Sequence, residues 1–439
     1  MKINKNSTTF LQLKRTYLFF KRKYKQKLNK ARKKENNSYI TTHFYMRKKH
    51  ISAYQSIGGK SARVKSNRRK HTLLIPKVFT LYNAPENVLM ITKEVADLIN
   101  HKHINHLHID HRKCEQHDLS AELLLANAVR SLDALKTKNG ARFKISGNFP
   151  ENEKMKRLLS SIGVVKETAA KRYHLNNKND LKLYKKISDP NEKESLFSNN
   201  RKKDATTEFV PYIDDCLSFI NARMDREEST KLNHYLGEVL GNAEEHSGEK
   251  LWTLLGYLDA KNPDDLYCEI VILNIGKTIY QTFDEKRNVE IVNGSWQSYL
   301  AKHLGKLNEE QLTLVHSMQQ NISSKLDEQI DRGQGSKHLI NLFHHLTEEC
   351  NRLNLENNVT SSSKPQMLIL SGGAMLKFDG TYKPSEDSKG LMRFALNSEN
   401  SIEIEPDECY IPSLRHGVAF PGTTIYIRFS LQQSELVSL

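Results

Sequence analysis

The chain lacks the long apolar segments that mark a membrane-spanning protein. No apolar run among its 439 residues reaches the roughly 18–20 residues that a membrane helix needs. The start of the chain does not have the pattern of a signal peptide either, because its best apolar stretch, 17–20, is short and lies between Arg15 and Lys21. We therefore expect a cytoplasmic protein without a membrane span.

Cysteine is also scarce, which excludes a disulfide framework. The five cysteines are far apart, odd in number and without CxxC spacing. Reduced thiols are the simplest interpretation, and the spacing does not predict a zinc site made of cysteines. The cysteines are Cys114, Cys216, Cys268, Cys350 and Cys409.

Acidic residues are almost missing from the first 70 positions. This stretch holds 22 of the 67 Lys and Arg but only one of the 51 acids, Glu35, whereas the remainder holds 45 basic and 50 acidic residues. Tyr17, Phe19, Phe20 and Tyr24 interleave with the first basic block, 14–34. This mixture suits a nucleic-acid backbone, where cations displace counterions and rings stack on bases. The alternative is a solvated, partly helical extension, since charge alone identifies no partner.

The chain after this basic N-terminal arm (1–72) divides by composition. Residues 73–170 predict a small α/β domain, with strands in 72–82, 103–110 and 141–147 and helices in 120–140 and 152–164. Residues 171–208 are polar and predict a linker.

The last section, 209–439, predicts a second domain. We expect a helix near 229–247 with Ser229 as its cap, a long helical insertion over 294–330, and a further helix after the glycines at 332–346. Strands are expected in 251–259, 266–276, 365–380 and 421–431.

The first of these helices places three polar side chains on one face. Glu238, Asn242 and His246 follow one another at intervals of four. A carboxylate can activate water, and an amide oxygen can bind Mg²⁺, which prefers hard oxygen ligands. Such spacing is also common on solvated helices, and His246 fits a packing or capping role better than a catalytic one.

Glycine motifs follow in order along the chain. In "LNIGKTI" (273–279), Asn274 precedes Gly276 by two positions. In "RGQGSKHLI" (332–340), Gly333 and Gly335 stand at the start of a helix, where backbone N–H groups can approach phosphates. The strand-like "GTTIYIRF" (422–429) closes the series.

Together these motifs resemble the GHKL ATPase domain of the Bergerat fold, over roughly 209–439 and in particular that of anti-sigma-factor kinases. The resemblance implies a two-layer α/β sandwich that binds ATP and Mg²⁺. Asn242 would ligate the magnesium ion, and Glu238 would be the catalytic residue that orients or deprotonates the attacking group. The implied nucleotide-binding residues are Asn242, Asn274, Gly276, Gly333, Gly335, Lys337 and Thr423.

Three positions depart from the GHKL pattern. Asn274 replaces the adenine-reading aspartate, so it can still accept a hydrogen bond but carries no charge. Thr278 and Lys337 stand where glycines are usual. Lys337 would either contact the γ-phosphate as a point charge or face solvent.

Residues 73–170 resemble a STAS-like domain of the kind found in anti-anti-sigma factors. In that family a strand ends in Asp and a serine near the next helix is phosphorylated. Asp110 and Ser120 take these positions here, which makes Ser120 a candidate phosphoacceptor. The alternative is that Asp118 or Ser120 simply caps the helix.

These resemblances predict a regulatory ATP-binding protein that couples Mg-ATP binding or hydrolysis to a STAS-like module and acts on a protein partner. One alternative is a protein-serine kinase of the anti-sigma-factor type. Another is a non-catalytic adaptor with a degenerate GHKL fold that binds nucleic acid through residues 1–70. Whether the protein is an ATPase, a kinase or only a binder stays open.

Overall fold

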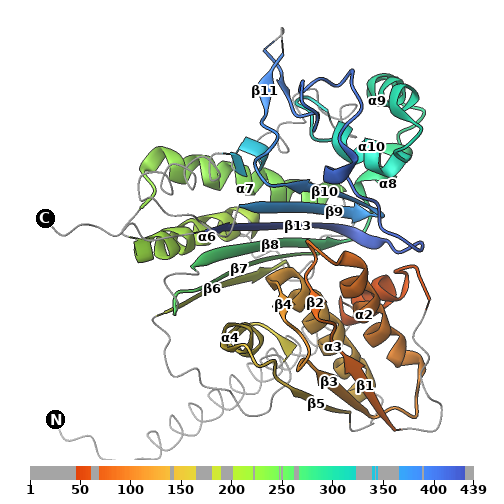
Figure 1. Ribbon diagram of the computed structural model, residues 1–439, viewed down its shortest axis with the longest axis vertical. Coiled ribbons are helices and arrows are strands. Elements are labelled where there is room, and N and C mark those ends of the chain that lie inside the picture. Colours follow the sequence, from red (N-terminus) through yellow and green to blue (C-terminus); the bar gives the residue numbers. More distant parts are fainter. Residues whose placement is uncertain are drawn as a thin grey trace, which may run out of the picture.

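The computed structural model gives the chain a mixed α and β structure, which confirms the coarse expectation of fold class (Figure 1). It describes residues 46–60, 69–138, 143–164, 180–188, 201–220, 223–246, 248, 251–261, 266–322, 339–341, 343–344, 365–387 and 390–430.

The N-terminal unit is built around a small parallel sheet. Its strands β1 (Lys70–Leu74), β3 (His106–Asp110) and β5 (Lys144–Asn148) lie in the order β1-β3-β5. The short strands β2 (Val78–Phe79) and β4 (Gln116–His117) form a second parallel pair. Its helices are α2 (Pro85–Asp97), α3 (Leu119–Lys138) and α4 (Glu153–Ser161), and a 3₁₀ turn (Leu98–Asn100) follows α2.

Helix α2 was not predicted from the sequence. Pro85 occupies its first turn, where a missing N–H costs nothing, and Val88, Leu89, Val95 and Ala96 form its buried face. The helical spacing of these apolar residues is visible in the sequence and indicates the helix.

The C-terminal unit is a six-stranded sheet in the order β10-β9-β13-β8-β7-β6, and every neighbouring pair in it is antiparallel. Its strands are β6 (Leu181–Ile187), β7 (Trp252–Asp259), β8 (Tyr267–Ile275), β9 (Gln366–Gly372), β10 (Ala374–Phe378) and β13 (Phe420–Ser430). Its helices are α6 (Arg201–Leu217), α7 (Arg226–His246), α8 (Ile279–Asp284), α9 (Glu290–His303) and α10 (Glu309–His316). The strands expected in 251–259, 266–276, 365–380 and 421–431 are therefore present.

The large sheet is buried on both faces. Along β7, Leu254 packs into the core beneath α6 and α7, whereas the next residue, Leu255, packs into the core of the N-terminal unit. The same alternation separates Ile272 from Val271 in β8. Figure 1 shows α6 and α7 on one side of the sheet and the N-terminal unit on the other. Helices therefore cover one face of the sheet and the N-terminal unit covers the other, because successive strand residues point to opposite faces.

Three expected boundaries differ from the structure. Part of the predicted linker is folded, since β6 pairs with β7 at the sheet edge and α6 begins at Arg201. Part of the predicted arm is folded too: residues 46–55 are helical, and Ile51, Tyr54 and Ile57 are buried in the N-terminal core. Their spacing of three gives this basic segment an apolar face that packs on the body.

Two helical segments also differ from the expected bounds. Helix α7 begins at Arg226, three residues before the expected cap Ser229. Within 294–330 the described residues form not one long helix but the end of α9 and the separate α10, which starts at a capping box of Asn308 and Gln311.

A buried arginine also joins the two units. Arg157 of α4 places Nε 2.7 Å from Oδ2 of Asp259 and Nη2 2.9 Å from Oδ1 of Asp180. Asp259 ends β7 and Asp180 immediately precedes β6. Loss of one partner would leave a buried charge uncompensated, so these bonds fix how α4 sits against the sheet.

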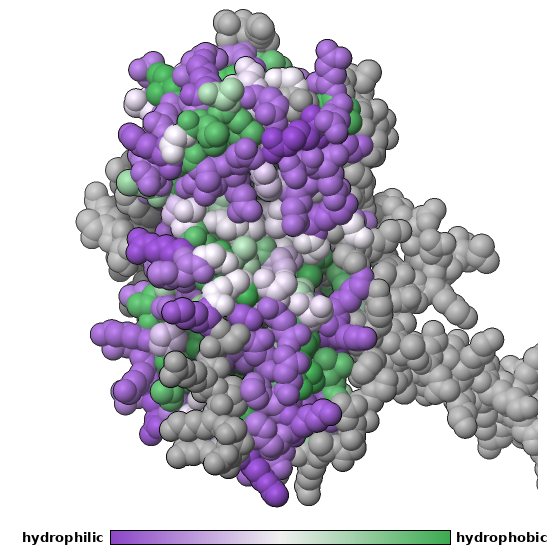
Figure 2. Space-filling model, turned by 90° about the vertical axis from the view of Figure 1, so that its right-hand side faces the viewer, coloured by the Kyte–Doolittle hydropathy of each residue, from purple (hydrophilic) through white to green (hydrophobic). Residues whose placement is uncertain are grey.

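No helix in the described part of the chain is long and apolar enough to cross a membrane. On the face shown in Figure 2, hydrophilic residues predominate and hydrophobic ones form small groups among them.

The shared core predicts that both faces of the sheet unfold together. Leu254 and Leu255 are adjacent, equally buried and on opposite faces, so they form a matched pair. Each Leu→Ala variant should lose about 2–5 kcal/mol of stability. In urea denaturation, both should shift one common transition. Two separate transitions, each sensitive to only one variant, would contradict the shared core.

Candidate nucleotide-binding site

Helix α7 presents two polar groups beside the large sheet. Its apolar residues Leu232, Leu236 and Leu240 are buried against the sheet. Glu238 is exposed and Asn242 is half-buried. Within the described residues, neither side chain has a hydrogen-bond partner, so both remain able to bind a ligand or a metal ion.

Asn274 connects this helix to two strands. It lies at the end of β8 in register with Thr423 of β13. Its Nδ2 donates to the carbonyl oxygen of Ala243 at 3.1 Å, and its Oδ1 accepts from the Thr423 backbone N–H at 2.8 Å. The sequence-predicted residues on α7, β8 and β13 therefore lie at one end of the sheet.

The environment of Asn274 bears on its expected role in adenine recognition. The residue is buried, and both polar atoms of its side chain have protein partners. An amide has two N–H donors and two acceptor lone pairs, so one of each remains available. Asparagine suits this position because it donates to Ala243 and accepts from Thr423, whereas an ionised aspartate could only accept.

Two glycines shape the backbone next to Asn274. Gly276 and Gly422 both have φ of +148°, which favours glycine. The Gly276 N–H donates to the Pro421 carbonyl oxygen at 3.1 Å. A Cβ on Gly422 would lie 2.2 Å from the Asn274 carbonyl oxygen, so a side chain cannot be placed there without moving a strand. The sequence singled out Gly276 but not Gly422.

The hydroxyl of Thr423 belongs to a small network that the sequence did not reveal. Its Oγ1 lies 2.9 Å from Oγ of Ser371, which accepts from the Ile279 backbone N–H at 2.9 Å. Ser371 lies in β9, and Ile279 begins α8. Strands β9 and β13 are thus tied to the start of the helix that follows the Asn274 segment.

Thr278 has a local structural role. It caps α8 through a capping box: the Gln281 backbone N–H donates to Thr278 Oγ1, and the Thr278 N–H donates to the Gln281 side chain. Because this box fixes the start of α8, the threonine is explained without reference to a nucleotide.

Several predicted residues lie outside the described part of the chain, namely Gly333, Gly335, Lys337 and the side chain of His246. A shallow groove between α6 and α7, lined by Val210, Pro211 and Asn233 among others, contains none of the predicted nucleotide residues. Asn233 and Asn242 are nine residues apart, which corresponds to about 13 Å along the helix. The groove is therefore separate from the predicted site.

Ser120 is poorly placed for phosphorylation. Its side chain is buried, and its hydroxyl donates to Oδ1 of Asp118 at 2.7 Å. Asp118 also accepts from the backbone N–H groups of Ala121 and Leu81, each at 2.7 Å, as a helix cap does. Asp110, the other STAS-like position, forms a bidentate pair with Arg112, which holds the pKa of that carboxyl well below its usual range. The capping interpretation of Asp118 and Ser120 fits these contacts.

Comparisons with protein-family models, with curated proteins and with solved structures gave no match for this chain. Its function therefore has to be argued from the residues themselves.

The side chain of Asn274 links Ala243 of α7 to Thr423 of β13 through two hydrogen bonds, which we call the Asn274 bracket. These two bonds should contribute measurably to stability. Asn274→Ala leaves the Ala243 carbonyl and the Thr423 N–H without this partner and should cost about 1–3 kcal/mol. Asn274→Asp should also destabilise, because a carboxylate cannot donate to Ala243. Asn233→Ala on α7, as control, should stay within about 0.5 kcal/mol of wild type in urea denaturation. Equal stability of Asn274→Ala and wild type would show that the bracket is not formed.

Proposed function

We propose that the protein binds Mg-ATP at the end of the large sheet where α7, β8 and β13 meet, and that it acts as a regulatory nucleotide-binding protein. The observation that carries the proposal is the Asn274 bracket next to two polar groups without partners. Asn242 is adjacent to Ala243, whose carbonyl oxygen Asn274 binds. The bracket therefore fixes the helix turn that would supply the magnesium ligand.

The chemistry of the two helix residues suits a nucleotide. The amide oxygen of Asn242 is a hard ligand for a Mg²⁺ ion that also contacts phosphates. Glu238 lies one turn earlier, about 6 Å along the helix. From there its carboxylate would orient a water molecule or a hydroxyl group for attack on the terminal phosphate.

The backbone around Asn274 suits the adenine base. Gly276 and Gly422 carry no side chains, so a flat base could approach the peptide groups beside them. The remaining amide hydrogen and lone pair of Asn274 would pair with the edge of the base. Because the amide is uncharged, its hydrogen bonds to the base would be weaker than those of a carboxylate.

A regulatory role is supported by the shared core. The sheet that carries Asn274 and Thr423 on its strands packs its second face against the N-terminal unit. If nucleotide binding moves the strand ends, the N-terminal unit would therefore shift as well, since packed cores transmit strain. The buried Ser120 argues against the N-terminal unit as a phosphorylation substrate of the same chain.

A second candidate function is nucleic-acid binding through the basic arm, supported by the charge asymmetry. The first 70 residues hold 22 Lys and Arg against one acid. Because Ile51, Tyr54 and Ile57 are buried, only the part before residue 46 can be removed without damaging the core.

Mg-ATP should stabilise the full chain against heat, because a ligand that binds only the native state shifts unfolding by mass action. At about 100 times Kd the gain is about 2.7 kcal/mol. Asn242→Ala should lose most of this gain, whereas Asn233→Ala, the same change elsewhere on α7, should keep it. A wild-type protein whose melting temperature does not change at millimolar Mg-ATP would overturn the proposal.

If the protein hydrolyses or transfers the terminal phosphate, Glu238→Gln should keep Mg-ATP binding and lose turnover by about 10²–10⁴-fold. Release or transfer of labelled phosphate measures this. Glu227→Gln is the control, because Glu227 lies on α7 and pairs only with Lys231 at the surface. Similar turnover in both variants would remove Glu238 from the reaction.

A protein that begins at Met46 should lose most nucleic-acid affinity and keep its response to Mg-ATP. For the full chain, each neutralised phosphate should contribute roughly −0.7 to −0.9 to the slope of log K against log salt. Fluorescence anisotropy with labelled DNA and RNA measures both. Equal affinity of the shortened and full chains would exclude residues 1–45 as the nucleic-acid site, and no binding by the full chain at low salt would exclude the whole arm.

A further inference from the structure

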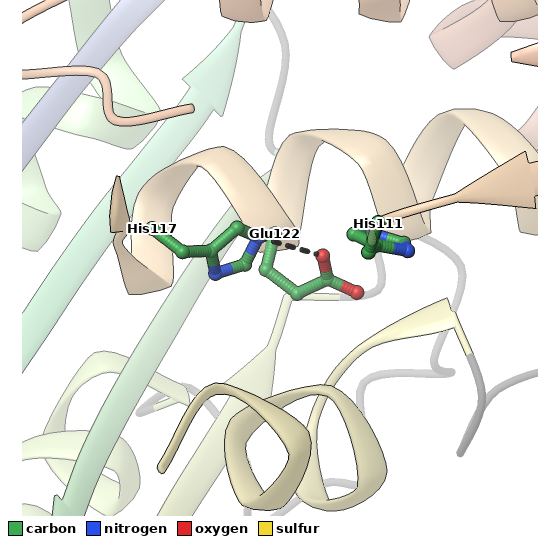
Figure 3. Close-up of side chains that lie close together, drawn as sticks. All are labelled: His111, His117 and Glu122. Carbon is green, nitrogen blue, oxygen red and sulfur yellow. Dashed lines mark ion pairs between the residues drawn. The ribbon is translucent and has the colours of Figure 1, made fainter. Parts of the chain in front are cut away.

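Three polar side chains gather at the start of α3, away from the nucleotide-binding site. His111 follows β3, His117 belongs to β4, and Glu122 lies in the first turn of α3. Their ligand atoms all lie within 4.8 Å of one another. Figure 3 shows the Glu122 carboxylate between the imidazole rings of the two histidines.

These side chains are buried, and two of their ring nitrogens lack hydrogen-bond partners in the described part of the chain. The His117 and Glu122 side chains are fully shielded from solvent, and His111 is 5% exposed. Nε2 of His117 and Oε2 of Glu122 lie 3.2 Å apart as an ion pair (Figure 3), whereas Nε2 of His111 and Nδ1 of His117 have no hydrogen-bond partner among the described residues. Buried polar atoms in proteins are nearly always hydrogen-bonded, so two unpaired ring nitrogens in one cluster point to a missing partner.

The other polar atoms of the cluster are held in place. Glu122 Oε1 accepts from the Val164 N–H at 2.7 Å, and a Cβ on Gly163 would lie 2.0 Å from the same oxygen. The His111 backbone N–H donates to the Asn148 carbonyl oxygen at 3.1 Å, and Nε2 of the His111 ring has no hydrogen bond to a described residue. Bonds of this kind orient the ligands of metal ions.

We propose that His111, His117 and Glu122 bind a structural zinc ion. Imidazole nitrogen and carboxylate oxygen are both ligands of Zn²⁺, at about 2.0–2.2 Å. Tetrahedral bonds of that length place neighbouring ligand atoms about 3.3–3.5 Å apart, so closing the cluster requires shifts of about 1 Å. Two histidines and a carboxylate also bind iron in oxygenases, but those sites keep open positions, whereas this one is shielded from solvent.

The neighbourhood of the cluster favours a cation such as zinc. Nε2 of His111 has no hydrogen bond within the described residues, so its lone pair is available to a cation. Cys114 lies in the turn between the two histidines, with its N–H donating to the His111 carbonyl oxygen at 2.9 Å. Its Sγ donates to the Gln116 carbonyl oxygen at 3.3 Å. A water molecule would complete the coordination.

Zinc at this position would fasten the start of α3. It would link the end of β3, strand β4 and the first turn of α3, next to the Asp118 cap. Helix α3 packs on β8 of the large sheet. Because zinc would bind only the folded cluster, its binding free energy would add to the stability of the whole chain.

The test is zinc binding by the full chain. Purified protein is stripped with a chelator, checked for folding by circular dichroism, and titrated with Zn²⁺ in competition with a zinc-responsive dye. Wild type should bind one zinc ion per chain tightly. Loss of an outer-shell partner alone costs about 10–100-fold in metal affinity, so His111→Asn and Glu122→Gln, which alter direct ligands, should weaken zinc binding by about 100-fold or more. Glu122→Gln preserves the acceptor for Val164, so it should remain folded.

His106→Asn is the control, because His106 lies on β3 outside the cluster and pairs with Ser146 Oγ at 2.7 Å. It should bind zinc as wild type does. Elemental analysis of the protein as purified identifies the metal. Absence of tight zinc binding by wild type, or equal affinity in wild type and both variants, would overturn the site. Stoichiometric iron in the purified protein would overturn the choice of zinc.

Discussion

The structure depends on one sheet whose two faces are both buried. In β7, β8, β9 and β13, successive apolar residues alternate between a core beneath α6 and α7 and a core formed with the N-terminal unit. This explains why "LLGYL" and "IVILNI" are almost continuously apolar, although a sheet with one face in water would alternate apolar and polar residues. The same sheet therefore decides the shape of both units, and neither unit keeps a complete core without the other.

The candidate nucleotide site is placed by that sheet. Its strand ends carry Asn274 and Thr423, and α7 lies against the face opposite the N-terminal unit. The hydrogen bonds of Asn274 then hold Asn242 near the strand ends. The proposed zinc site lies on the other side, where α3 packs on β8. The two proposals thus concern opposite faces of one sheet and can fail independently.

The sequence was informative where a pattern depended on local structure. The strands of the large sheet and helices α3, α4 and α7 followed from apolar runs and helical spacing. The GHKL-like motifs brought together Asn242, Asn274, Gly276 and Thr423, which indeed meet at one end of the sheet. The biochemical role of these residues stays a prediction.

What the sequence could not show depends on contacts between distant segments. Strand β6 lies at the edge of the sheet and is polar in sequence, so its sequence predicts a linker and not a strand. The positive charges of residues 46–55 predict part of a basic arm, although Ile51 and Tyr54 of this helical segment pack in the core. His111, His117 and Glu122 are visible in the sequence, but only the fold buries their side chains together and leaves a nitrogen of each histidine without a partner among the described residues.

The most direct test of the account is hydrogen–deuterium exchange of the full chain with and without Mg-ATP. The account predicts slower exchange in three separated segments, 238–246, 273–279 and 420–426, because they meet at the proposed site. Smaller protection should extend into α3 through the shared core, and Asn242→Ala should abolish all of it. Unchanged exchange in the three segments at millimolar Mg-ATP, or protection confined to other parts of the chain, would contradict the account.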